Sequence, residues 1–226
     1  MTATAPRQPI ESRPGLVVEG DAPPEWVLRW CGHSGRTVHT STAPGAGDSV
    51  IVLRETAFAE PPRIAVALRR LPDDAAVLAD AFDAAVHLDG SLTLIHGVPL
   101  SFGERSVGLS DALLRGEDVL LEARALLETA GADVAVGTRL VRAWPHELVG
   151  EQLDADLLAV GGPHAAVDDV GLVAATAVRH APCPVLVVAR PTAGREDPRS
   201  NVAWAREPWI PPPRASVELT ARPARG

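Results

Sequence analysis

The stretch Asp156–Arg190, DLLAVGGPHAAVDDVGLVAATAVRHAPCPVLVVAR, decides the fold of this chain. Continuous apolar runs at 157–160 and 185–189 are typical of strands buried on both faces. Two glycines stop the first run, and two prolines precede the second. Between them, an apolar stripe over 170–178 with cations after it predicts a helix. The spacing therefore predicts a strand, a helix and a second strand of one parallel sheet.

Strands and helices alternate upstream of this stretch as well. The pattern predicts strands at 63–68, 91–98 and 133–141, helices at 75–88 and 110–130, and a short helix from Trp144 to about Leu153. This order predicts an α/β fold: a Rossmann-like, doubly wound parallel sheet of five strands with helices on both faces. Ligands of such sheets bind at the carboxyl ends of the strands, where the strand order reverses.

The segments DLLAVGG, Gly171 and HAPCPVLVV together resemble the C-terminal signature of the universal stress protein family. The resemblance covers about Arg63 to Arg190, a little over half of the chain. It implies the strand order 3-2-1-4-5, in which the ends of strands one and four lie side by side. It also implies a cytoplasmic protein of the stress response.

Three parts of the chain follow from this reading. Residues 63–190 form the universal stress protein-like domain, residues 1–62 an N-terminal extension, and residues 191–226 a tail rich in Pro and Arg that we expect to be disordered. Within the extension, strands are predicted at Leu16–Glu19 and Ser49–Leu53, with a helix at Pro24–Cys31 between them. An alternative interpretation takes 1–62 as a degenerate partial repeat of the same fold, because LVVEGDAPPEWVLRW loosely echoes a first strand and helix.

The family's nucleotide site is altered in this sequence. In nucleotide-binding members, an Asp after the first strand meets the adenosine, and a loop of the form GxxG, nine residues, then G and Ser or Thr wraps the phosphates. Here an Arg replaces that Asp, a His replaces the second glycine, six residues precede the third glycine, and a Leu replaces the hydroxyl. The positions that match the nucleotide site are Arg69, Val98, Gly161, Gly162, His164, Gly171 and Leu172.

These departures predict a stress-response protein that acts by binding rather than by catalysis, without ATP in the family's mode and without another cofactor. The sequence lacks GxSxG, GxxxxGK[ST] and HExxH, so no catalytic residues are predicted. Two alternatives stay open. One is an ATP-binding switch with slow hydrolysis, in which Arg69 or His164 contacts phosphate. The other is an interaction adaptor that recruits an unknown protein partner through Trp residues in its terminal extensions.

Composition and charge argue against several classes of partner. The net charge of −8 and a pI near 5.3 argue against nucleic acid and against an anionic membrane surface. No apolar run approaches the roughly 18 residues of a membrane span. The two Cys residues form no CxxC pair, so no metal site is predicted.

Pairing is expected at the last strand. The resemblance implies a homodimer through that strand, Val185 to Ala189, and its apolar sequence would favour pairing if its edge were exposed.

Overall fold

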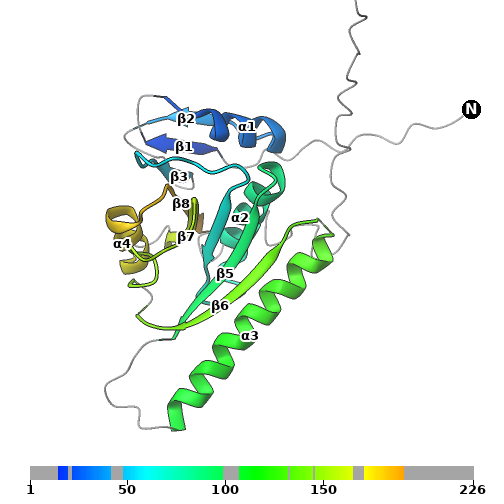
Figure 1. The fold of residues 1–226 in the computed structure, drawn as a ribbon, viewed down its shortest axis with the longest axis vertical. Helices are drawn as coiled ribbons and strands as arrows, with labels where there is room; N and C mark the ends of the chain where they lie inside the picture. The colour runs from blue at the N-terminus through cyan, green and yellow to red at the C-terminus, as the bar shows by residue number, and fades with distance from the viewer. Residues whose placement is uncertain are drawn as a thin grey trace, which may run out of the picture.

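The computed structural model describes residues 15–19, 22–41, 48–98, 107–131, 133–144, 146–164 and 171–190. Strands and helices alternate through most of this part of the chain (Figure 1). The elements are β1 Leu16–Glu19, α1 Glu25–Ser34, β2 Val38–Thr40, β3 Ser49–Val52, β4 Arg63–Ala67, α2 Ala75–His87, β5 Ser91–Val98, α3 Val107–Ala130, β6 Val136–Arg142, β7 Leu157–His164, α4 Leu172–His180 and β8 Val185–Arg190.

The strands form one sheet, ordered β2-β1-β3-β8-β7-β4-β5-β6. Its last five positions carry the predicted order, since β6, β5, β4, β7 and β8 correspond to strands 3, 2, 1, 4 and 5 and are mutually parallel. The prediction of a five-stranded sheet is wrong, because the sheet has eight strands. Three short strands from the first part of the chain extend it beyond β8.

The added strands and α1 form what we call the N-terminal block, residues 15–53. Within it β1 lies between β2 and β3 and is parallel to both. β3 then pairs antiparallel with β8, with Val50 opposite Val187 and Val52 opposite Val185. The chain's own β3 therefore occupies the outer edge of β8 at Val185–Val187, which is part of the edge through which the expected homodimer at Val185–Ala189 would pair. The homodimer itself stays a prediction.

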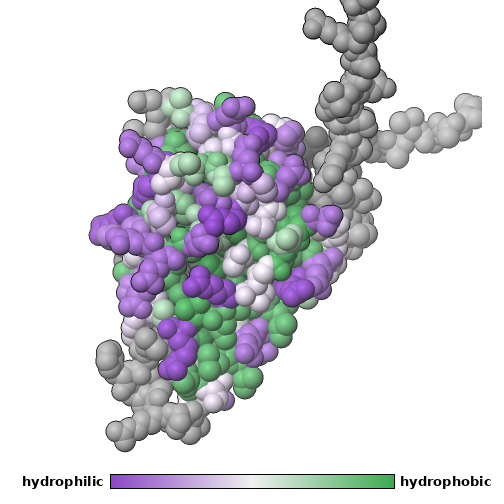
Figure 2. Space-filling view, viewed as in Figure 1, coloured by the Kyte–Doolittle hydropathy of each residue, from purple (hydrophilic) through white to green (hydrophobic). Residues whose placement is uncertain are grey.

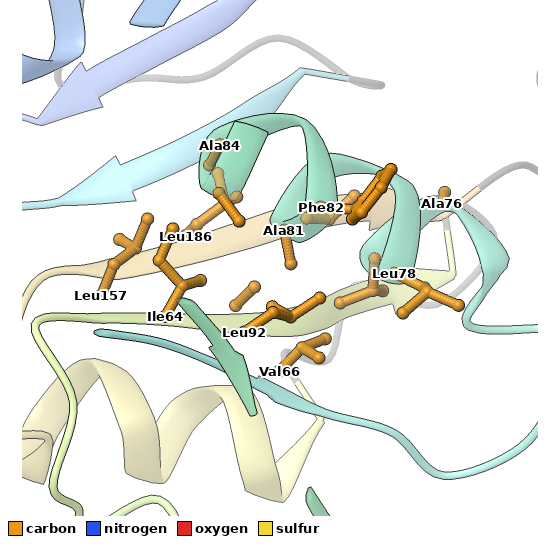
Figure 3. Packing of buried hydrophobic residues seen from close by; sticks show 14 of the residues in the cluster. Ile64, Val66, Ala76, Leu78, Ala81, Phe82, Ala84, Leu92, Leu157 and Leu186 are labelled. Carbon is orange, nitrogen blue, oxygen red and sulfur yellow. The ribbon is translucent and has the colours of Figure 1, made fainter. Parts of the chain in front are cut away.

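Helices cover both faces of the sheet. On one face, α1, α2 and α3 bury their apolar sides in a single cluster that includes Trp30, Leu78 and Leu120. Figure 3 shows Leu78 and Ala81 of α2 above Ile64 and Leu92 of the neighbouring strands. On the other face, α4 packs with the crossover between β6 and β7 in a second cluster. The doubly wound arrangement follows from apolar residues that alternate between these two faces along each strand.

Two elements differ from their predictions. The segment from Trp144 to Leu153, expected to be a short helix, contains turns and no α-helix among its described residues. Strand β7 does not end before the glycines but continues to His164. The residues at 165–170, just before α4, lie outside the described residues.

The outer surface of α3 is more apolar than that of a typical exposed helix. Figure 2 shows hydrophobic residues gathered along α3 in the lower half of the view. Leu114 and Leu121 are 57% and 65% exposed. They lie two helical turns apart and so share one face of the helix.

Candidate functional site

The candidate site lies at the carboxyl edge of the sheet, where β4 and β7 are neighbours. Ile64 pairs with Leu157 and Val66 with Ala159 in parallel register, so Arg69 and Gly161 follow at the same edge. β5 is the other neighbour of β4, and its last residue, Val98, is buried. The topology therefore brings three parts of the predicted nucleotide site to one edge, as the strand order requires.

The loop after β4 is closed by its own carboxylates. The side chain of Asp74 is fully buried and accepts hydrogen bonds from the backbone N–H groups of Arg69 at 2.6 Å and Arg70 at 3.1 Å. The guanidinium of Arg69 lies 3.3 Å from Asp73, and the Nε of Arg70 donates to the same carboxylate at 3.1 Å. The donors that a bound phosphate would use are thus already engaged.

The glycines after β7 lie in extended backbone. β7 runs through Gly161 and Gly162, with an irregular register before His164 pairs with Arg190 of β8. Among the described glycines, positive φ is found at Gly35 and Gly131 and not at these two positions. A Cβ on Gly162 would lie 3.1 Å from the carbonyl oxygen of Val188 and 3.1 Å from the side chain of Val187. Gly162 is therefore required by close packing against β8.

The start of α4 offers little to a ligand. Gly171 is the N-cap residue, with φ −49° and ψ 146°, and a Cβ added there would have nothing within 4 Å. Leu172 follows and is 66% exposed. No side chain satisfies the N-cap. The part of the predicted phosphate loop at 165–170 lies outside the described residues.

His96 lies on β5 near the same edge. Its Nδ1 is 3.0 Å from the carbonyl oxygen of Leu68, which fits a neutral imidazole with the proton on Nδ1. Burial lowers the pKa of His96 and outweighs the opposite effects of this hydrogen bond and of Asp74. The geometry indicates a histidine that ties the end of β5 to the loop after β4.

A separate cavity of about 500 Å³ lies beneath the crossover between β6 and β7. A helix at this position would cover β5 and β6 on this face, but the crossover forms turns. Arg139 of β6 is exposed and lies in register with Ile95 of β5. The lining residues are Ile95, Arg139, Val141, Ala143, Glu147, Leu148, Glu151, Gln152 and His180.

The structure thus places Arg69, Val98, Gly161 and Gly162 at one edge of the sheet, in a closed arrangement. The sequence analysis missed Asp73 and Asp74 as partners of that loop, although LPDD directly follows the arginines. It also missed the cavity residues, which come from four separate segments with no common motif.

The sheet order and the helices on both faces define a doubly wound α/β protein. The model of the Universal stress protein family matches residues 61–189. The chain therefore belongs to the universal stress protein family. No curated protein matches the chain.

Solved structures of similar fold include two universal stress proteins. One is a universal stress protein in complex with cAMP, at 22% identity and a TM-score of 0.47, covering 56% of this chain and 95% of that chain. Another is universal stress protein UspA from Lactobacillus plantarum, at 19% identity and a TM-score of 0.46, covering 57% and 99%.

A third similar structure is the cytoplasmic domain of a prokaryotic cation chloride cotransporter. It has 13% identity and a TM-score of 0.49, and the match covers 86% of this chain and 68% of that chain. In the present chain, none of the helices within the described residues has both the length and the apolar character needed to cross a bilayer.

Proposed function

We propose that this universal stress protein acts in the stress response by binding rather than by turnover, and that it does not hold ATP in the family's mode. The observation that carries the proposal is the course of β7, which continues through Gly161 and Gly162 and pairs His164 with Arg190. A phosphate loop needs consecutive backbone N–H groups that converge on the anion. Beyond Ala159, β7 is registered with β8 and no longer with β4, and the N–H groups of an extended strand point alternately to its two sides and do not converge on one point.

The loop after β4 supports the same proposal. Arg69 and Arg70 are cations at an anion-binding edge, but both lie against Asp73. The carboxylate of Asp74 accepts hydrogen bonds from the backbone N–H groups of both arginines. A triphosphate would have to displace two carboxylates, and the repulsion between like charges opposes this.

The two cysteines give no support to catalysis. Both thiols are buried. Burial raises the pKa of Cys31 and raises that of Cys183 to about 11, so the nucleophilic thiolate is scarce at neutral pH.

Calorimetric titration of the full chain with Mg-ATP, ADP and cAMP tests the proposal. We expect no saturable heat and no thermal shift at millimolar nucleotide, with an ATP-binding family member as the positive control. Saturable binding of ATP followed by slow release of phosphate would contradict it and support the ATP-binding switch.

A matched variant separates charge from loop geometry. Asp73→Asn frees the guanidinium groups of Arg69 and Arg70 while keeping the size of the side chain. If the ion pairs of Arg69 and Arg70 with Asp73 are what excludes anions, this variant should gain weak, salt-sensitive binding of phosphate that the parent chain lacks.

A second candidate ligand position is the cavity beneath the crossover. Its floor is apolar, from Ile95, Val141 and Leu148, and Arg139 provides a guanidinium for which no ion pair is found among the described residues. A volume of about 500 Å³ suits a small molecule. We infer a small molecule with an apolar body and a carboxylate that reaches Arg139, an attraction that has to outweigh the repulsion from Glu147 and Glu151 in the same lining.

Thermal-shift titrations with 4-methylpentanoate and benzoate test this second candidate. Stabilisation should be lost in Arg139→Gln. It should be kept in Arg142→Gln, because alternation along β6 places Arg142 on the opposite face of the sheet. Equal responses of both variants, or no response of the parent chain, would exclude the cavity as the binding position.

The interaction adaptor stays a proposal, and it now depends on fewer of the tryptophans in the terminal extensions. Trp26 and Trp30 are 8% and 0% exposed, so these two indoles are not available to a partner. Trp204 and Trp209 lie outside the described residues. Pull-downs with residues 195–226 deleted should lose partners if these tryptophans recruit them, and unchanged partners would remove the idea.

A further inference from the structure

The direction of the strands reverses once across the described sheet. β1, β2 and β3 are parallel to one another, and so are the five strands from β4 to β8. The reversal occurs between β3 and β8, the antiparallel neighbours. The sheet therefore consists of two parallel sets that run in opposite directions.

The two sets repeat one arrangement. β1, α1 and β2 form a strand, a helix and a neighbouring parallel strand, and β4, α2 and β5 do the same. Both helices bury their apolar sides in the same cluster on the same face of the sheet, where they contact each other (Figure 1). The two units differ in their distance from the β3–β8 pair, because β1 adjoins β3 directly whereas β7 lies between β4 and β8. The N-terminal block thus has the layout of a shortened second copy.

Buried polar contacts hold the block on α2. The guanidinium of Arg36 and the carboxylate of Asp80 form an ion pair with side chains 3% and 4% exposed. Ser49 lies 3.4 Å from the same carboxylate. The indole Nε1 of Trp30 donates to Asp83 at 2.8 Å. These groups lie between the block and the helix. Removing the partner on one side would leave the group on the other side buried without a partner, which is destabilising.

The strand pair itself is apolar on both sides. Val50, Ile51 and Val52 of β3 face Val187, Leu186 and Val185 of β8. An open β8 edge of this composition would pair with another strand, most simply with β8 of a second copy, because a two-fold axis makes such a pair self-complementary.

We propose that the N-terminal block covers, within the same chain, the β8 edge through which a second copy of residues 63–190 would otherwise pair. The partner that this surface fits is thus another copy of the chain, and the block holds the protein as a monomer. The block acts as a built-in substitute for a partner subunit.

The first test is the mass of the full chain in solution. Light scattering at micromolar concentration should give the monomer mass of 23.7 kDa. A stable dimer would overturn the proposal.

A cross-link tests whether β3 comes from the same chain. Opposite residues in antiparallel strands have Cα atoms about 4.5–5.5 Å apart, within the range that a disulfide spans. The double variant Val50→Cys with Val187→Cys should oxidise to a cross-linked monomer, and Val50→Cys alone should not. A covalent dimer would mean that β3 is supplied by another chain, against the proposal.

Release of the block is tested by Asp80→Ala, which leaves Arg36 buried without its carboxylate. Amides of β3 should exchange faster while those of β4 and β5 keep their protection, and the mass should rise with concentration toward a dimer. Arg29→Ala is the control, because its pair with Glu60 is exposed and lies outside the α1–α2 contact.

If β3 stays protected in Asp80→Ala, Ile51→Pro replaces it in the same measurements, since proline removes a backbone donor from β3. A variant whose β3 exchanges freely but which stays a monomer at every concentration would show that the β8 edge does not recruit a second copy.

Discussion

Asp74 illustrates how one side chain can decide what a loop is able to bind. The carboxylate is buried just before α2. It accepts hydrogen bonds from two backbone N–H groups of the loop after β4. Asp74 is the residue directly before α2, the position at which an Asp side chain often caps a helix. Its side chain, however, makes no cap hydrogen bond and turns to the loop instead. A choice between two nearby sets of donors is set by tertiary packing, so local sequence does not determine it.

Two glycines of the predicted phosphate loop should respond differently to substitution. Gly162→Ala should lower the free energy of unfolding by about 1–3 kcal/mol, because the new Cβ meets the backbone of β8. Gly171→Ser should be neutral or stabilising by a few tenths of a kcal/mol, since the position is open and a hydroxyl can cap α4. Urea denaturation measures both. Equal losses would argue against packing as the reason for Gly162.

His96 should make stability depend on pH near neutrality. Its folded-state pKa is lowered by burial, so the unfolded chain binds the proton more readily. Stability is therefore full above the unfolded pKa of about 6.5 and falls as the pH drops below it. His96→Asn, which can keep a donor toward Leu68, should reduce this fall between pH 7 and 5 in urea titrations. An identical pH dependence in both proteins would contradict this role.

At the scale of elements, apolar periodicity was sufficient for most of the helices and strands from β4 to β8. The sequence predicts α2 at 75–88 and α3 at 110–130, close to the observed Ala75–His87 and Val107–Ala130. β2 was not predicted, because Val38–Thr40 is three residues long and largely polar. The segment from Trp144 to about Leu153 was expected to be helical, but its described residues form turns, and these still bury Val149 and Leu153 under the sheet.

Which strands pair was harder to predict from the sequence than which segments form strands. The strand at Ser49–Val52 was expected, but its neighbour was not, since a short apolar strand fits many edges and its partner lies far away in sequence. For the same reason the continuation of β7 past Gly161 could not be inferred. Glycines mark both turns and irregular strand positions, and only the adjacent β8 distinguishes these.

Arg54, just after β3, should stabilise the end of α4. Its Nε donates to the carbonyl of Ala181 at 3.3 Å, and its Nη2 donates to that of Val178. A cation at this end of a helix also complements the dipole. Arg54→Met should therefore lower the free energy of unfolding by about 1–2 kcal/mol. Arg179→Met, an exposed residue in the last turn of α4, is the control and should change it by less than about 0.5 kcal/mol.

At the scale of the whole molecule, the N-terminal block and the domain at 63–190 share one core. The larger cluster contains Leu16, Trp30 and Ile51 from the block together with Ile64 and Leu157 from the domain. The two parts have no separate apolar interior on this face. Their stabilities should therefore be linked.

In the parent chain, where the Arg36–Asp80 ion pair holds the block on α2, we expect the block and the domain to unfold in one cooperative transition. Amide exchange under mildly destabilising conditions should give β1 and β3 the same opening free energy as β4 and β7, within about 1 kcal/mol. A block that opens at a much lower free energy would contradict a shared core. It would also indicate that the β8 edge is uncovered part of the time.

The β3–β8 pair has a consequence for synthesis of the chain. β3 leaves the ribosome early, whereas β8 is the last described strand to appear. β1 is already available to one side of β3, but the side that pairs with β8 stays open through the translation of almost the entire domain. The native sheet around β3 can thus be completed only after β8 has been made, and a chain truncated before residue 185 should depend on chaperones to stay soluble.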